Sequence, residues 1–198
     1  MTAMKYILTP SLRAFKEAVR SFLKSEIPRL CEDGPPGGRI AVGVMVQFGD
    51  HFPRACAAPG KGRAEFGVTE SVVALEEIAR AIPSAAAELG KRAVFRGPSP
   101  ALGRAAANLG SAEGILAPRL AKPPFPGASS PVGPFQELMD LVSAIECARL
   151  TLFRAAVQED EGKRDSGRAA AVERLTAGIK SRAEAVLGEF KKGDTGEA

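Results

Sequence analysis

Residues 97–134 read GPSPALGRAAANLGSAEGILAPRLAKPPFPGASSPVGP. Proline and glycine fill 14 of these 38 positions, against a background of about 12% for the two residue types together. Proline lacks a backbone donor, and glycine loses the most conformational freedom when it is ordered. Within this stretch, only residues 101–109 have a helical pattern. We therefore expect an extended Pro/Gly-rich arm that becomes ordered on a partner surface and separates two folded parts of the chain.

The residues before this arm predict a small antiparallel sheet. The clearest strand covers residues 40–48, where β-branched and aromatic side chains alternate with small or polar ones. Residues 63–68 and 91–96 are the two further expected strands. The predicted fold class is therefore α+β, although most residues of the whole chain are expected in helices.

Two helices are expected to pack on this sheet. Thr9-Pro10 has the composition of a helix start, and apolar residues follow it at three- and four-residue spacing. Pro28 should end or kink this first helix near Glu26. A second helix is expected over residues 70–82, with Thr69 as its cap.

The C-terminal third predicts an antiparallel helical hairpin. Two amphipathic helices are expected over about residues 134–161 and 168–190, and the short sequence GKRDSG at 162–167 connects them. The predicted organisation is an α+β domain, an extended basic arm, a helical hairpin and a tail, which cover residues 1–96, 97–134, 135–192 and 193–198.

The net charge of +4 is too small to imply nucleic acid by itself, but the basic residues are clustered. Four lie side by side on the first expected helix, and the others lie in or next to the arm. The candidate contacts to nucleic acid or to an acidic partner are Arg13, Lys16, Arg20, Lys24, Lys91, Arg92, Arg96, Arg104, Arg119 and Lys122. The competing interpretation is a solvated basic surface.

No motif for catalysis, a cofactor or a metal stands out, and we assign no residue to these roles. The single histidine and the absence of a C-x-x-C pair argue against a zinc site. His51 lies five residues before Cys56, and the two are the only candidate Cys–His nucleophile pair. An enzyme that uses this pair is a third hypothesis, disfavoured because the sequence offers no orienting third group.

Three widely separated cysteines favour a reducing, intracellular compartment. No apolar run approaches the roughly 20 residues that a membrane-spanning helix needs. Residues 1–25 are basic, acid-poor and amphipathic, which is typical of organellar transit peptides. An organellar or virion-associated location therefore stays open.

Two functions remain as the main hypotheses. The first is a non-catalytic structural or accessory subunit of a virion, an organellar complex or a ribonucleoprotein. It would bind other subunits, or copies of itself, through the 97–134 arm and the hairpin. The alternative is a protein that binds nucleic acid, RNA in particular, through the stripe on the first helix and the cluster within residues 91–122.

Overall fold

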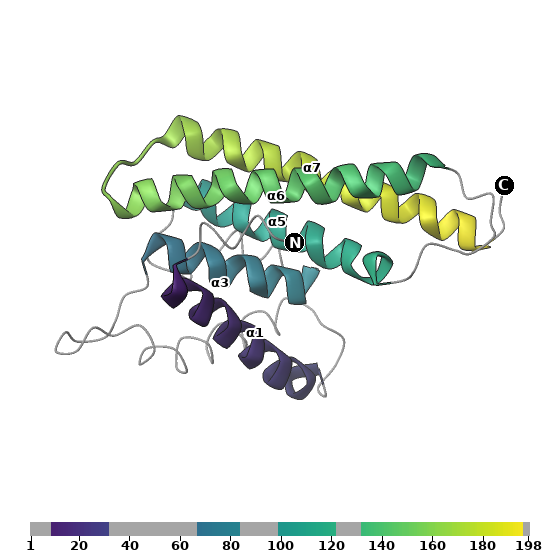
Figure 1. Cartoon of the computed structure of the whole chain (residues 1–198), viewed down its shortest axis with the longest axis horizontal. Coiled ribbons are helices and arrows are strands. Elements are labelled where there is room, and N and C mark those ends of the chain that lie inside the picture. Colours follow the sequence, from purple (N-terminus) through teal and green to yellow (C-terminus); the bar gives the residue numbers. More distant parts are fainter. Residues whose placement is uncertain (1–8, 32–66, 84–98, 122–131, 196–198) are drawn as a thin grey trace.

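A computed structural model of the chain describes residues 9–31, 67–83, 99–121 and 132–195. Within these ranges, 91% of the residues are helical and none lies in a strand. The helices of this part of the chain, labelled as in Figure 1, are α1 (Pro10–Cys31), α3 (Val68–Ala81), α5 (Pro100–Leu120), α6 (Val132–Asp160) and α7 (Ser166–Thr195).

The helices are stacked around α3 and α5. In Figure 1, α6 and α7 cross at the top, α5 lies below them, α3 follows, and α1 lies at the bottom. Among the described helices, α5 packs most extensively against α7 and α3, whereas α1 packs against α3 alone. In α3, 11 of 14 residues are buried, because neighbouring helices surround it on several sides. The described residues share one hydrophobic core, to which all five helices contribute.

The predicted α+β fold is wrong, because the described core consists of helices. The expected strands at 40–48 and 91–96 lie outside the described residues. The third expected strand, at 63–68, overlaps the described residues at its C-terminal end. There Gly67 is the N-cap of α3, and Val68 is the first residue of this helix. A six-residue apolar pattern does not distinguish a strand from a helix start. Here a carboxylate from α6, described below, accepts the first N–H groups of α3 and fixes the helix start.

The predicted extended arm is also wrong over its first half, because Pro100–Leu120 forms helix α5. Three of its glycines face α3. A Cβ atom at Gly110 or Gly114 would lie well inside 3.0 Å of a backbone carbonyl oxygen of α3, whereas one at Gly103 would make an ordinary contact with Leu75. Glycine therefore allows a close approach of the two helix backbones, and the packing outweighs its low helix propensity. Residues 122–131 lie outside the described part.

Helix α1 begins as the sequence predicts and ends later. The backbone N–H of Leu12 donates to Thr9 Oγ1 at 3.2 Å, so Thr9 caps the helix. The apolar face formed by Phe15, Val19, Phe22 and Leu23 is buried. The helix continues through Pro28 to Cys31, so it does not end near Glu26, and the kink at Pro28 stays a prediction.

The two C-terminal helices are joined by residues 161–165, with Gly162 at φ 77° in the turn. Acidic side chains at the end of α6 also accept hydrogen bonds from backbone N–H groups at the starts of two other helices. Asp160 Oδ1 accepts the N–H of Val68 at 2.6 Å, and Asp160 Oδ2 accepts the N–H of Thr69 at 3.0 Å. Glu159 Oε2 accepts the N–H of Ser99, next to the start of α5, at 2.9 Å. Asp160, and not the predicted Thr69, thus supplies the side-chain cap of α3.

Candidate functional site

The six predicted basic residues that the structure describes do not form one surface. Lys91, Arg92, Arg96 and Lys122 lie outside the described residues, so their roles stay predictions. The other six are divided between α1 and α5. On α1, Arg13 and Lys24 are exposed on the outer side, whereas Lys16 is buried and Arg20 is half-buried.

Lys16 and Arg20 are turned toward α3, where both bind Glu77. The Nζ atom of Lys16 lies 3.0 Å from Glu77 Oε1. Arg20 Nε donates to Glu77 Oε2 at 2.8 Å, and its Nη2 donates to Oε1 at 3.1 Å. These two cations therefore neutralise an internal carboxylate. Two members of the predicted stripe, Lys16 and Arg20, therefore face α3, whereas Arg13 and Lys24 are exposed.

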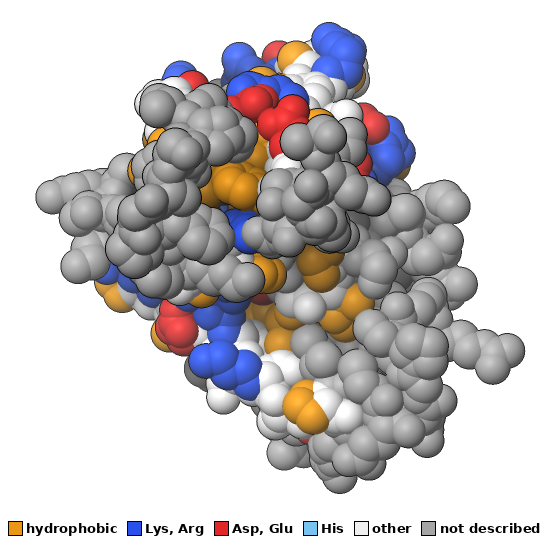
Figure 2. Space-filling view, turned by 90° about the vertical axis from the view of Figure 1, so that its right-hand side faces the viewer, with side chains coloured by type: hydrophobic (Ala, Val, Ile, Leu, Met, Phe, Trp, Pro, Cys, Tyr) orange, Lys and Arg blue, Asp and Glu red, His pale blue; other side chains and the backbone are white. Residues whose placement is uncertain are grey.

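The two described basic residues of α5 also have intramolecular partners. Arg104 Nε donates to Glu173 Oε1 at 2.5 Å, and its Nη2 donates to Glu173 Oε2 at 2.9 Å, which joins α5 to α7. The guanidinium of Arg119 lies 5.1 Å from the ring centre of Phe190, within cation–π range. Figure 2 shows one end of the molecule, where described basic and acidic side chains lie next to each other along the upper edge.

A second ion cluster surrounds the buried Arg149 of α6, which is 2% exposed. Its Nε donates to Glu76 Oε1 of α3 at 2.5 Å, and its Nη1 donates to Glu146 Oε1 of α6 at 2.5 Å. Its Nη2 donates to Glu113 Oε2 of α5. One cation therefore links three helices of the bundle.

Because Glu76 and Glu77 are consecutive, the two clusters form one ionic network. Arg80 also belongs to it, through an Nη2 hydrogen bond to Glu77 Oε2 at 2.7 Å. The network has four cationic and five anionic members on α1, α3, α5 and α6, and Glu17 is its exposed outer member. They are Lys16, Arg20, Arg80, Arg149, Glu17, Glu76, Glu77, Glu113 and Glu146.

The two adjacent glutamates of α3 differ in their electrostatics. Burial opposes the ionisation of Glu77, but the hydrogen bond from Arg20 and the charges of Lys16 and Arg80 outweigh it and lower its pKa to about 2. Burial dominates at Glu76 and raises its pKa, against the opposing charges of Arg149 and Lys16. Within the described residues, no group donates a hydrogen bond to Glu76 Oε2. Glu77 therefore remains charged, whereas Glu76 is the member of the pair that more readily takes up a proton.

The lowered pKa of Glu77 predicts a specific loss of stability in acid. Its carboxylate stabilises the fold above the ordinary pKa of 4.5, and this contribution is lost as the pH falls toward the folded-state pKa of about 2. The unfolded chain takes up a proton at this residue at a higher pH than the folded chain does. The free energy of unfolding should therefore fall by about 2 kcal/mol between pH 6 and pH 3 because of this residue. Glu77→Gln should be less stable than the wild type at pH 6, and the difference should shrink by this amount at pH 3. Urea denaturation at both pH values measures it.

Glu189→Gln is the matched control, because Glu189 is exposed on α7. Its stability should follow that of the wild type at both pH values. If Glu77→Gln and the wild type instead lose stability in parallel between pH 6 and pH 3, then Glu77 does not have a depressed pKa and the ion pairs with α1 are not significant.

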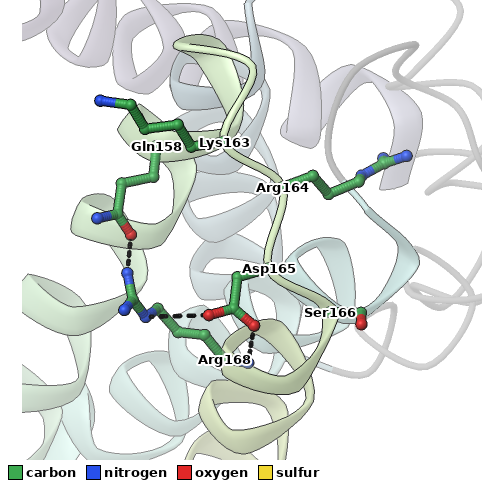
Figure 3. Close-up of a pocket in the computed structure, with 6 residues that line it drawn as sticks. All are labelled: Gln158, Lys163, Arg164, Asp165, Ser166 and Arg168. Carbon is green, nitrogen blue, oxygen red and sulfur yellow. Dashed lines mark hydrogen bonds and ion pairs between the residues drawn. The ribbon is translucent and has the colours of Figure 1, made fainter.

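An open depression of about 520 Å³ lies at the turn between α6 and α7. Figure 3 shows the residues that line it: Gln158, Lys163, Arg164, Asp165, Ser166 and Arg168. Its three basic side chains each have a partner nearby. Lys163 pairs with Glu161 at 2.9 Å, Arg164 with Glu159 at 3.2 Å, and Arg168 with Asp165 at 3.8 Å. In Figure 3 the Lys163 and Arg164 side chains point in opposite directions, so the depression has no convergent set of donors.

The outer face of α6 has few charges. We define this face by its exposed residues between positions 139 and 157, which are Met139, Asp140, Ser143, Cys147, Thr151, Arg154 and Val157. Only two of the seven are charged. Met139 and Val157 are 44% and 42% exposed, and Cys147 is an exposed free thiol. The exposed side of α7 instead combines Leu175, which is 49% exposed, with several arginines and glutamates.

Neither the ionic network nor the α6 face is among the sites that the sequence predicts. One signal for the network is present in the sequence: Glu76 and Glu77 stand between Leu75 and Ile78 in a helix whose other residues are largely apolar. Buried acids require cationic partners, and lysine and arginine at helical spacing on another segment could supply them. The candidate enzyme residues His51 and Cys56 lie outside the described residues.

Within the described ranges, no group of three or more histidine, cysteine or acidic side chains could hold a metal ion. Every helix in these ranges is too short or too polar to traverse the hydrocarbon core of a membrane. No family model, curated protein or solved structure matches the chain significantly.

Proposed function

We propose that the chain is a non-catalytic structural or accessory subunit of a larger assembly and binds other proteins through the outer face of α6. The observation that carries the proposal is the composition of this face, where two of seven exposed residues are charged and two are large and apolar. Depletion of charge together with exposed Met is typical of the centre of protein–protein interfaces.

The position of α6 also suits this role. Its opposite side is fixed in the bundle by the buried residues Leu138, Leu141, Ile145, Leu152 and Phe153. Arg149 and Asp160 connect it to α3 through charged hydrogen bonds. A rigid helix that presents a preorganised face loses little conformational entropy on binding.

The 97–134 segment is not part of this proposal as an extended arm, because α5 is a core helix. The helical hairpin, which the sequence indicates as the other binding element, takes the central role. The alternative function, nucleic-acid binding, rests on basic residues of which Lys16, Arg20 and Arg104 have carboxylate partners within the chain. The assembly could be a virion, an organellar complex or a ribonucleoprotein.

The proposal predicts that negative charge introduced on the α6 face weakens the binding of partner proteins. We expect the full-length variant Met139→Glu/Val157→Glu to lose at least tenfold in the recovery of its protein partners, because buried acidic side chains oppose association. Quantitative affinity purification from cells that make the protein, before and after nuclease treatment, measures this recovery. Circular dichroism checks that the variant remains folded.

Leu175→Glu is the matched control, since Leu175 is as exposed as Met139 but lies on α7. It should retain the partners. If the wild type and the Met139→Glu/Val157→Glu variant recover the same amount of partner protein, the proposal is contradicted. Recovery of RNA or DNA that depends on basic residues, with protein partners lost after nuclease treatment, would favour the nucleic-acid alternative instead.

A further inference from the structure

We propose that the partner of the α6 face is a second copy of the same chain, and that the two α6 helices pair antiparallel about a twofold axis at Cys147. This inference rests on the proposed function and names the occupant of the same face. The supporting observation is that exposed residues of α6 are arranged symmetrically about Cys147. These residues do not belong to the core of the bundle.

Five exposed residues form a stripe that is symmetric in position about Cys147. Ser143 and Thr151 lie four residues before and after it, and Asp140 and Arg154 lie seven residues before and after it. At about 100° per residue, all five lie within roughly 40° of one line along the helix. They therefore share the centre of the exposed face, spaced three or four residues apart.

An antiparallel twofold pair places complementary residues opposite each other. A residue that precedes Cys147 meets the residue that follows it by the same number of positions in the other copy. Asp140 of each copy then faces Arg154 of the other, about 10 Å from the axis on either side. Ser143 faces Thr151, and the two Cys147 side chains meet at the axis. In a parallel pair, each of these charges would face a like charge.

The charges of the stripe are available for this pairing. Asp140 accepts one exposed hydrogen bond, from Gln136 Nε2 at 3.2 Å. No carboxylate in the described part of the chain pairs with Arg154. Charge complementarity of this kind sets the register and orientation of an interface more than its affinity.

Apolar residues flank the stripe on one edge. Met139 and Val157 are 18 residues apart, or five helical turns, so they share one side of α6, and half-buried Leu150 lies between them. A twofold axis perpendicular to the helices brings Met139 of one copy within about one helical turn of Val157 of the other. Small side chains at 143, 144 and 147 allow a close approach at the centre.

The size of this surface predicts a reversible dimer. The helix spans about 30 Å between positions 139 and 157, and one helix pair buries less than the 1,200–2,000 Å² of a stable interface. We therefore expect an association of micromolar or weaker affinity, visible as a concentration-dependent sedimentation coefficient of the full chain.

Charge reversal tests the register. Asp140→Arg and Arg154→Asp each place like charges opposite one another, and each should weaken dimerisation at least tenfold. The double variant Asp140→Arg/Arg154→Asp restores opposite charges and should dimerise within threefold of the wild type. Arg174→Asp, at an exposed position of α7, is the control and should have no effect. A monomeric wild type at concentrations up to the millimolar range, or single variants that dimerise like the wild type, would overturn the inference.

Cross-linking tests the position of the axis. In a Cys31→Ser/Cys56→Ser background, a short bismaleimide should join Cys147 to Cys147, and Asp140→Arg should abolish the product. Ser181→Cys with Cys147→Ser, which moves the thiol to an exposed site on α7, should give little dimer. If the chain is monomeric while Met139→Glu/Val157→Glu still removes other proteins, the second-copy inference fails and the proposed function stands. If neither dimerisation nor the binding of other proteins depends on the α6 face, both the second-copy inference and the proposed function fail.

Discussion

Arg149→Met is expected to lower the free energy of unfolding by about 3–5 kcal/mol at pH 7, because it removes one partner of a buried ion cluster and leaves the other members uncompensated. The guanidinium donates to carboxylates on three helices, and Glu76 among them is fully buried. Burial already raises the pKa of Glu76. The loss should therefore be smaller at pH 5 than at pH 7, because the raised pKa favours the neutral form of this carboxyl as the pH falls. Urea denaturation at the two pH values measures both effects.

A second substitution separates the ion pair from the packing of the arginine stem. Arg149→Met/Glu76→Met should recover at least half of the stability lost in the single variant, since two apolar side chains leave no buried charge unpaired at this contact. Arg174→Met, at an exposed position of α7, should change stability by less than about 0.5 kcal/mol. A single Arg149→Met variant as stable as this control would show that the ionic network does not hold the bundle together.

Gly110→Ala is expected to destabilise the chain by about 2–3 kcal/mol, although alanine is the better helix former by about 1 kcal/mol. Its methyl group would lie well inside 3.0 Å of the carbonyl oxygen of Glu76, and backbone atoms of a buried helix cannot rotate away. Helices α3 and α5 would have to move apart. Thermal unfolding should show a decrease in Tm of several degrees.

Gly178→Ala supplies the matched control on a helix surface. Nothing lies within 4 Å of a Cβ atom at Gly178, which is exposed in the interior of α7. This variant should be stabilised by about 0.5–1 kcal/mol. Two glycine-to-alanine substitutions are thus expected to act in opposite directions. Stabilisation by Gly110→Ala would show that α5 does not approach α3 as closely as the structure indicates.

The parts of the fold that the sequence predicts are those with local signals. Thr9 and the spacing of Phe15, Val19 and Phe22 are sufficient for the start and the buried face of α1. Apolar residues at helical spacing likewise predict α3 and the two C-terminal helices. In each case the signal comes from residues within a few turns of one another, so no knowledge of tertiary contacts is needed.

The errors come from residues whose role depends on a distant helix. Gly103, Gly110 and Gly114 indicate an irregular arm when only local propensity is considered. They lie on the side of α5 that contacts α3, where the absence of a side chain allows close packing. This spacing is visible in the sequence, but local sequence patterns do not show that α3 packs against these glycines.

The candidate sites show the same limit. Lys16 and Arg20 fit the pattern of a polyanion-binding stripe, and their actual partner is Glu77, 57 or more residues away in sequence. The acids of the Arg149 cluster come from three helices, so no local motif reveals them. The symmetric stripe about Cys147 could be read from the sequence alone, but only the structure shows that this side of α6 is exposed.

Amide hydrogen exchange over α5 in the purified chain tests the helical bundle, because the packing of α3 and α7 requires α5 to be a core helix and not an extended arm. Buried amides between Ala105 and Ala112 should exchange as slowly as those of Val72 to Ile78 in α3, through global unfolding. Exchange of residues 100–120 at the rate of an unstructured chain, while α6 and α7 remain protected, would show that α5 is not part of the core.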